Sequence, residues 1–570
     1  MQQGQPPVQQ SLQQTQQSME QMQPPQVLAP EQPVQVERLQ QEQPASPFSR
    51  RRAPGAFPPQ VRRGYPPGGP PRGLAPSFEY PAHGPTSFAD DEELAAAAAA
   101  ARPVAQAEPE PDRSSEGPLS LTTRVEYSAL PRDQKQDVFG LVTVQAAAAA
   151  IAQSPTEARQ PMDIVCVLDV SGSMQGDKIA QVKAAVRFIV DQAQPQDRLS
   201  IVAFNSSARR ELPLRRMTVE GKNDATVAAL RLTAGGGTSI AAGLSTALAV
   251  MEQRRQRNKV SAILLLTDGN DGCTRGSLPS LLARAGQARC GLYAFGFGQD
   301  HDAALLSQVA EQARTPFTFV EDTENLREAF AGAVGGLSSI IAQNVEVRLE
   351  CQVPLKRVNT PFAVAWQGDR VATVTLPDIF SEERRDILVE LEVPTTDSEG
   401  VACLLEASLR YTDLQTERPV ASAPVRMEAV RVEEPQPEAE PDEEVSAQRE
   451  RVEVTRALQE AAQRGDEGHF EAAQEVLGDA ESRLHAKGRK LKFSDALSQE
   501  IADARSRMQS RSSWERGGRA ELRDAVQMHS IQRCTNMSIS SKSAVKKTSK
   551  AMYVNSRQTE WIGASKSSEG

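Results

Sequence analysis

Between residues 163 and 335, short apolar runs alternate with longer segments whose apolar residues recur every three or four positions. The short runs are almost continuously apolar, which predicts strands buried on both faces of a sheet. The longer segments have the spacing of amphipathic helices. This alternation is typical of a doubly wound α/β domain with a mainly parallel sheet. The predicted strands are 164–168, 199–204, 260–266, 291–297 and 317–320, with an edge strand near 209–214, and the predicted helices are 178–192, 224–232, 240–253, 278–288, 302–312 and 326–335.

Segments of strict alternation flank this region on both sides. In 344–351, Val345, Val347, Leu349 and Cys351 fall on one face of a strand, and mostly charged residues fall on the other. Because such segments both precede and follow the α/β region, we expect a β-sandwich into which the α/β domain is inserted. The other alternating segments are 119–127, 138–144, 371–376, 387–393 and 404–411.

The two ends of the chain have a different composition. Residues 1–118 are rich in Gln, Pro and Ala with few residues for a core, which predicts disorder. We therefore expect that this arm can be removed without loss of thermal stability. Towards the other end, helical spacing returns around Leu458, over 470–484 and over 497–508, which predicts a helical region with a hairpin turn at Gly465 and Gly468. The predicted domains are 1–118 disordered, 119–150 first part of the β-sandwich, 161–342 α/β domain, 343–432 second part of the β-sandwich, 433–444 acidic linker, 445–536 helical region and 537–570 flexible tail.

Composition narrows the class of protein. The formal charge of −10 argues against general nucleic-acid binding, which requires a basic face. No apolar stretch approaches the roughly 20 residues of a membrane-spanning helix. No two of the six cysteines form a CxxC pair, in which two residues separate the cysteines. Neither a zinc ribbon nor a RING domain is therefore expected. We expect a reduced, cytoplasmic protein without a membrane span.

A group of oxygen-bearing residues follows the predicted strands. In DIVCVLDVSGSM, Asp169 ends an apolar run, and Ser171 and Ser173 follow at alternate positions. GGGTSI contains Thr238, and LLLTDGND places Asp268 at the end of another apolar run. Mg²⁺ prefers oxygen ligands at about 2.0–2.1 Å in near-octahedral geometry. Two carboxylates and three hydroxyls would balance its charge, with one position open to water that a partner's carboxylate could replace.

These five residues, in this order, resemble the metal-ion-dependent adhesion site of von Willebrand factor type A domains. The resemblance covers about 162–342 and implies that Ser171, Ser173 and Thr238 contact Mg²⁺ or Mn²⁺ through hydroxyls. It implies that Asp169 and Asp268 bind directly or through water. It also implies that their two strands are neighbours in the sheet, and that a protein partner with an acidic residue binds at the metal face. The alternative is that both acids only cap turns and helices.

An enzymatic function is less well supported by the sequence. A haloacid-dehalogenase-type enzyme would need a second Asp two positions after Asp169, where this chain has Ser171. His301 is the one histidine of the α/β region and precedes a helix that Asp302 can cap. The glycines 235–237 are not followed by the Lys and Ser or Thr of a phosphate-binding loop.

The sequence therefore predicts a non-enzymatic scaffold that binds proteins through a divalent cation. Three alternatives remain: binding through the helical tail with a purely structural α/β domain, substrate recognition within a ubiquitin-transfer assembly, and a hydrolase.

Overall fold

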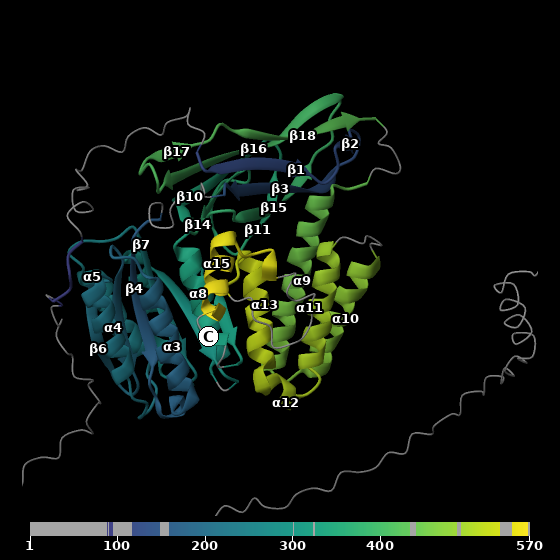
Figure 1. Cartoon of the computed structure of the whole chain (residues 1–570). Coiled ribbons are helices and arrows are strands. Elements are labelled where there is room, and N and C mark those ends of the chain that lie inside the picture. The colour runs from purple at the N-terminus through teal and green to yellow at the C-terminus, as the bar shows by residue number, and fades with distance from the viewer. Residues whose placement is uncertain are drawn as a thin grey trace, which may run out of the picture. The chain divides into compact units, whose positions relative to one another are not determined.

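A computed structural model of the chain describes residue 88 and residues 90–94, 117–148, 159–299, 301–322, 325–433, 440–486, 492–535 and 550–567. Its central element is a six-stranded sheet in the order β6-β5-β4-β7-β8-β9, of which Figure 1 labels β6, β4 and β7. All neighbouring pairs are parallel except β5 and β6, which makes β6 an antiparallel edge strand. The strands are β4 (Met162–Asp169), β5 (Arg198–Phe204), β6 (Ala208–Arg216), β7 (Val260–Thr267), β8 (Gly291–Phe297) and β9 (Phe317–Val320).

Helices cover both faces of this sheet. In β4, Ile164, Cys166 and Leu168 share a core with the helices of one face. The alternate residues Val165 and Val167 share a second core with the helices of the other face. Burial on both faces explains the near-continuous apolar strands, and the predicted doubly wound fold is confirmed. The helices on the first face are α3 (Asp177–Gln192), α4 (Val219–Arg231) and α8 (Leu326–Leu337), and those on the second are α5 (Ile240–Gln253), α6 (Thr274–Gln287) and α7 (Ala303–Ala313).

Two further sheets form a β-sandwich with one shared core, to which Val142 and Val389 contribute from one sheet and Val347 and Leu405 from the other. One sheet has the order β1-β3-β15-β11, and the other has the order β12-β13-β10-β16-β18-β2. Strands from before and after the α/β domain share both sheets, so the α/β domain is an insertion. The strands are β1 (Leu119–Val125), β2 (Ala129–Pro131), β3 (Gln136–Ala146), β10 (Ile340–Cys351), β11 (Leu355–Asn359), β12 (Ala363–Gln367), β13 (Val371–Leu376), β14 (Ile379–Phe380), β15 (Arg384–Val393), β16 (Gly400–Asp413), β17 (Pro419–Ala421) and β18 (Val425–Val432).

The C-terminal helices pack around a core that includes Leu458, Leu477, Ile501 and Trp514. Asp442 caps the first of them by accepting hydrogen bonds from the backbone N–H groups of Glu444 and Val445. This helix therefore begins inside the predicted acidic linker. The helices are α9 (Glu443–Asp466), α10 (Phe470–Ala486), α11 (Lys492–Arg507), α12 (Arg511–Ser513), η3 (Trp514–Gly518) and α13 (Arg519–Ile531).

The prediction of a flexible tail over 537–570 is wrong for its last part, where α15 (Ser556–Ser567) lies against α8 (Figure 1). Trp561 is buried, and its ring meets that of Phe188 edge to face at 6.3 Å between centroids. The amide of Gln558 donates to the carbonyl oxygens of Gly332 and Cys534. Tertiary contacts therefore order a segment that its Ser- and Lys-rich composition marks as polar.

The prediction of a wholly disordered arm over 1–118 is also wrong in part, because Phe88 and residues 90–94 contact the α/β domain. The other residues of the arm lie outside the described part of the chain, except residues 117 and 118, which directly precede β1. No helix in the described part of the chain is both long and apolar enough to cross a membrane.

Candidate metal site

The five predicted site residues lie at one edge of the α/β sheet. Asp169 is the last residue of β4, and Asp268 follows β7 directly. These two strands are neighbours and run parallel, with Leu168 paired to Leu266. Their carboxyl ends therefore meet where the winding direction of the sheet reverses, which is where open α/β sheets bind ligands.

Three side-chain oxygens at this edge form a continuous chain. The Oγ atoms of Ser171 and Ser173 are 3.0 Å apart. The Ser173 hydroxyl donates to Oδ1 of Asp268 at 2.7 Å. Neighbouring ligands of an octahedral Mg²⁺ with bonds of about 2.0–2.1 Å are roughly 2.9 Å apart. The spacing of these oxygens therefore fits a hard divalent cation.

Asp169 is fully buried and is fixed at both of its oxygens. Oδ1 accepts the backbone N–H of Ser171 at 2.8 Å, and Oδ2 accepts the hydroxyl of Thr267 at 2.5 Å. Burial raises the pKa of Asp169, although these hydrogen bonds oppose the rise. An ionised carboxylate oxygen keeps a second acceptor position. Asp169 can therefore still accept a hydrogen bond from a metal-bound water.

Backbone contacts hold the glycine-rich loop of Thr238 beside the serine loop. The N–H of Gly172 donates to the carbonyl of Gly236 at 3.0 Å, and that of Gly235 donates to Val170 at 2.8 Å. A Cβ at Gly269 would lie 2.9 Å from Oγ1 of Thr238. Thr238 is thus packed against the residue that follows Asp268, and all five predicted residues are brought together.

Three residues at the site do not belong to the predicted set, and two of them contact its acids directly. Thr267 orients Asp169, as described above. Lys178 in α3 places its Nζ 2.5 Å from Oδ2 of Asp268. In the sequence, Thr267 directly follows the predicted strand 260–266, and Lys178 is the first residue of the predicted helix 178–192. No sequence signal separates Lys178 from the other lysines.

A third such residue, Asp271, ties together the helices that follow the site loops. Its carboxylate accepts the backbone N–H of Ile240 at 2.7 Å and the hydroxyl of Thr274 at 2.5 Å. The first residues of α5 and α6 are therefore joined through one buried acid. A sequence signal for Asp271 exists, because it lies in the same TDGND segment as Asp268.

The predicted cap by Asp302 is present, whereas His301 beside it is buried and does not lie on the surface. Asp302 caps α7 by accepting the N–H of Leu305 at 2.9 Å. His301 places Nδ1 2.8 Å from the carbonyl oxygen of Gly298. Within the described residues, no three His, Cys, Asp or Glu side chains gather as a metal-binding group. A cation at the β4 and β7 edge would therefore depend on the hydroxyls as well as the two carboxylates.

The fold and this edge together define a doubly wound α/β domain with an oxygen-lined loop cluster at its switch point. Residues 163–332 match the family model of the von Willebrand factor type A domain. The chain therefore contains a von Willebrand factor type A (VWA) domain over these residues.

Comparison with known proteins identifies relatives that match parts of the chain. The chain is 32% identical over 254 residues to the E3 ubiquitin-protein ligase WAV3 of Arabidopsis thaliana, a match that covers 42% of this chain and 32% of the plant protein. It thus spans about a third of the length of that relative. It is 27% identical over 312 residues to the uncharacterized protein sll0103 of Synechocystis sp., covering 51% of this chain and 71% of that protein.

Among solved structures, a von Willebrand factor type A protein from Catenulispora acidiphila aligns with a TM-score of 0.57. The alignment covers 74% of this chain and 98% of the other, at 17% sequence identity. At this identity the likeness concerns the fold alone. It extends well beyond residues 163–332, so the likeness in fold includes parts outside the VWA domain.

Proposed function

We propose that Asp169, Ser171, Ser173, Thr238 and Asp268 bind a divalent cation, Mg²⁺ or Mn²⁺, and that the chain uses this cation to bind a protein partner. The observation that supports the proposal most directly is the spacing of 2.7–3.0 Å along the oxygens of Ser171, Ser173 and Asp268. If the acids only capped turns and helices, the side chains of Ser171, Ser173 and Asp268 would not need to converge from two loops.

Burial and charge at the site support a protein ligand with a carboxylate. Asp169 and Asp268 are buried, whereas Ser173 is exposed, so the cluster opens towards solvent on the serine side. Two carboxylates would neutralise a dication. When bound, the cation would supply a positive centre with an open position, which suits an acidic side chain of a partner.

Calorimetric titration of Mg²⁺ into the full chain tests the first half of this proposal. Wild type should show saturable binding, and Ser173→Ala and Asp268→Asn should weaken it at least tenfold. Asp191→Asn, which changes an exposed acid of α3, is the matched control and should bind as wild type does. Equal binding by all four proteins would contradict the assigned site. No binding by wild type would instead favour partner binding through the helical region.

The names of the plant relatives favour one second candidate, which is substrate recognition within a ubiquitin-transfer assembly. Because these 570 residues contain no closely paired cysteines, we expect the chain to be the recognition part and not the transferring enzyme. With activating and conjugating enzymes alone, the chain should form no ubiquitin conjugates. Conjugate formation under these conditions would contradict the non-enzymatic assignment. The cytoplasmic location stays a prediction.

A further inference from the structure

A short acidic segment of the N-terminal arm lies along the free edge of β6. The segment consists of Phe88 and residues 90–94, and four of these six described residues are Asp or Glu. The backbone N–H of Glu92 donates to the carbonyl of Leu214 at 2.9 Å. In the other direction, the N–H of Leu214 donates to Oδ1 of Asp91 at 2.9 Å, and that of Arg216 donates to Oε2 of Glu92 at 2.6 Å. The segment therefore satisfies edge groups that would otherwise be open to pairing with another strand.

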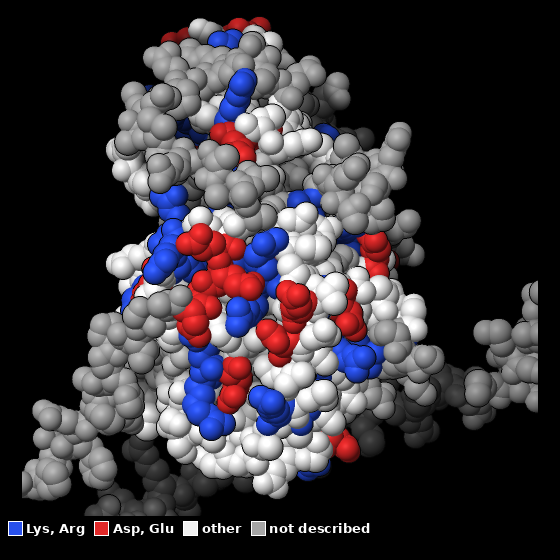
Figure 2. Space-filling view, turned by 60° about the vertical axis from the view of Figure 1, so that its left-hand side comes forward, with Lys and Arg blue, Asp and Glu red and all other residues white. Residues whose placement is uncertain are grey.

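Arginines of the α/β domain surround the segment. Arg210 pairs with both Asp90 and Asp91, the latter at 2.7 Å, and its guanidinium lies 3.9 Å from the ring centroid of Phe88. Arg215 pairs with Glu92 at 3.3 Å. Figure 2 shows acidic and basic side chains side by side on this face of the molecule. The segment thus combines charge pairing with an aromatic contact on one arginine.

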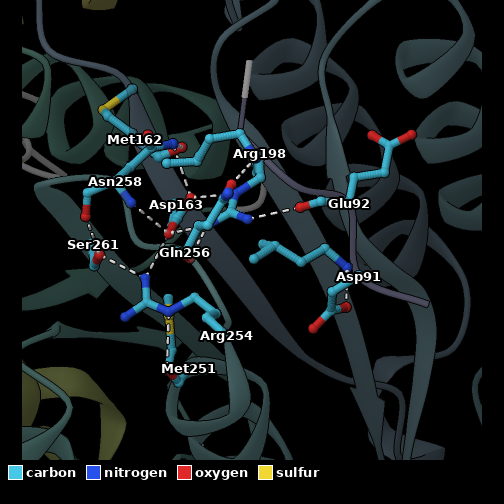
Figure 3. Close-up of polar contacts among 12 residues, drawn as sticks. Asp91, Glu92, Met162, Asp163, Arg198, Met251, Arg254, Gln256, Asn258 and Ser261 are labelled. Atoms are coloured by element: carbon cyan, nitrogen blue, oxygen red, sulfur yellow. Dashed lines mark hydrogen bonds and ion pairs between the residues drawn. The ribbon is translucent and has the colours of Figure 1, made fainter. Parts of the chain in front are cut away.

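One of the arginines is part of the domain's interior. Arg198 is 2% exposed and makes a two-point ion pair with Asp163, with contacts of 2.8 and 2.7 Å. Its remaining Nη1 donates to the carbonyl of Glu92 at 2.8 Å. Figure 3 shows this arginine between the buried Asp163 cluster and the segment. Because Asp163 holds Arg198 in place, the donor that meets the segment's backbone is preorganised.

The ends of the segment are also held. The N–H of Phe88 donates to the side chain of Gln253 at 3.2 Å, and the N–H of Leu94 donates to that of Gln256 at 2.6 Å. Both glutamines come from the end of α5 or the loop after it. Contacts to β6, to Arg198 and to these glutamines therefore come from three separate parts of the domain. Non-specific attraction between surface charges would not explain these contacts, because they hold the backbone of the segment at both ends and at its centre.

We propose that the edge of β6, with Arg198, Arg210 and Arg215, is a binding site for an extended acidic peptide that begins with an aromatic residue, and that the acidic segment of the same chain is its resident ligand. The site lies along β6, the edge strand of the sheet, and Arg198 links it to Asp163 at the start of β4. The candidate metal site lies at the other end of β4, so the two sites are separate. A tethered ligand competes at an effective concentration on the order of millimolar. A free peptide should therefore bind well only after the resident segment is weakened.

The experiment uses the full chain and a fluorescent peptide with the sequence of residues 85–96, in the presence of a chelator. In one variant, Asp90→Asn, Asp91→Asn and Glu92→Gln together weaken the resident segment. Peptide anisotropy should show at least tenfold tighter binding to this triple variant than to wild type. Adding Arg210→Glu should abolish that binding, and a peptide with lysines at the positions of Asp90 and Asp91 should restore it. Adding Arg231→Glu, which changes an exposed arginine of α4, should have no effect.

Two results would overturn the proposal. If the peptide binds wild type and the triple variant equally, or does not bind the triple variant, the β6 edge is not a peptide site occupied by the segment. If wild type sediments as a dimer that the triple variant does not form, the segment binds a second copy, and the assignment as a ligand of its own chain is wrong.

Discussion

The ammonium of Lys178 lies 2.5 Å from Oδ2 of Asp268, on the same carboxylate whose other oxygen accepts the hydroxyl of Ser173. Lys178 comes from the first turn of α3 and is partly exposed, whereas the Asp268 side chain is fully buried. A positive charge from the protein therefore neutralises one of the two acids that a divalent cation would need.

Replacing Lys178 by Met should strengthen Mg²⁺ binding, because the cation would no longer share Asp268 with a fixed positive charge. The Coulomb energy of two unit charges a few ångströms apart near a protein surface is a few kcal/mol. After screening, we expect about a tenfold gain, which corresponds to about 1.4 kcal/mol. Calorimetric titration measures it, with Lys183→Met on the same helix as the control. Unchanged binding by Lys178→Met would contradict this competition, and weaker binding would show that the lysine supports the site.

Replacing Asp163 by Asn should destabilise the fold strongly. Asp163 is fully buried and pairs with Arg198 and Arg254, with Nη–Oδ2 distances of 2.7 and 2.6 Å (Figure 3). Removing its charge leaves two buried guanidinium groups without their counter-ion, a change that typically costs about 3–5 kcal/mol. Urea unfolding of the variant, compared with Asp224→Asn at an exposed position of α4, gives the difference directly. If the free energy of unfolding fell by less than 1 kcal/mol, water would have to reach Arg198 and Arg254 and replace the lost charge.

Replacing Glu383 by Gln should reduce stability in a pH-dependent way. Burial alone would raise the pKa of Glu383, but the charges of Arg385 and Arg533 outweigh it and lower the pKa below the ordinary value of 4.5. The stabilisation is therefore complete above about pH 4.5 and is lost as the pH falls through the folded-state pKa. Thermal unfolding should show a large difference from wild type at pH 7 that shrinks below pH 4.5.

Asp378 supplies a control of opposite sign for the Glu383 experiment. Burial raises its pKa, so the ionised form is disfavoured in the folded state. Asp378→Asn should accordingly gain stability relative to wild type as the pH rises above the ordinary range of aspartate. A parallel pH dependence of Asp378→Asn and Glu383→Gln would contradict the sign assigned to one of them.

Replacing Trp561 by Ala should destabilise the α/β domain, because α15 packs on α8 and Trp561 joins its core. Truncation of a large buried aromatic side chain typically costs about 3–5 kcal/mol. Met552→Ala, at an exposed apolar position of the same C-terminal segment, should change the free energy of unfolding by less than 1 kcal/mol. Equal unfolding curves for wild type and Trp561→Ala would restore the prediction of a flexible tail.

The sequence predicted those elements whose burial is complete along a strand or along one face of a helix. The predicted strand 164–168 lies within β4, because every residue of β4 is buried and apolar or paired. The predicted helix starts at 278, four residues after the first residue of α6. In the structure Asp271 accepts the N–H groups of Cys273 and Thr274 and so provides the missing cap.

The candidate site was predictable where its residues stand in a fixed local order. Asp169, Ser171 and Ser173 share one loop, and strand pairing brings Asp268 to the same edge. Lys178 and the acidic segment were not predictable, because their roles depend on which surface the fold places opposite them. A lysine in a first helical turn and a run of four acids in a polar arm are ordinary solvated features in sequence.

The contacts of α8 have a consequence for how the VWA domain can respond to a ligand. A Cβ at Gly332 would lie 1.9 Å from the carbonyl oxygen of Thr535, so the helix backbone touches the chain that follows α13. On the same helix, a Cβ at Gly335 would lie 3.1 Å from the side chain of Trp561. A displacement of α8 would have to break both contacts, and a ligand can drive it only through a matching difference in affinity. The contacts of α8 with the C-terminal residues therefore hold this helix in one position, and the free energy of breaking them limits how far it can be displaced.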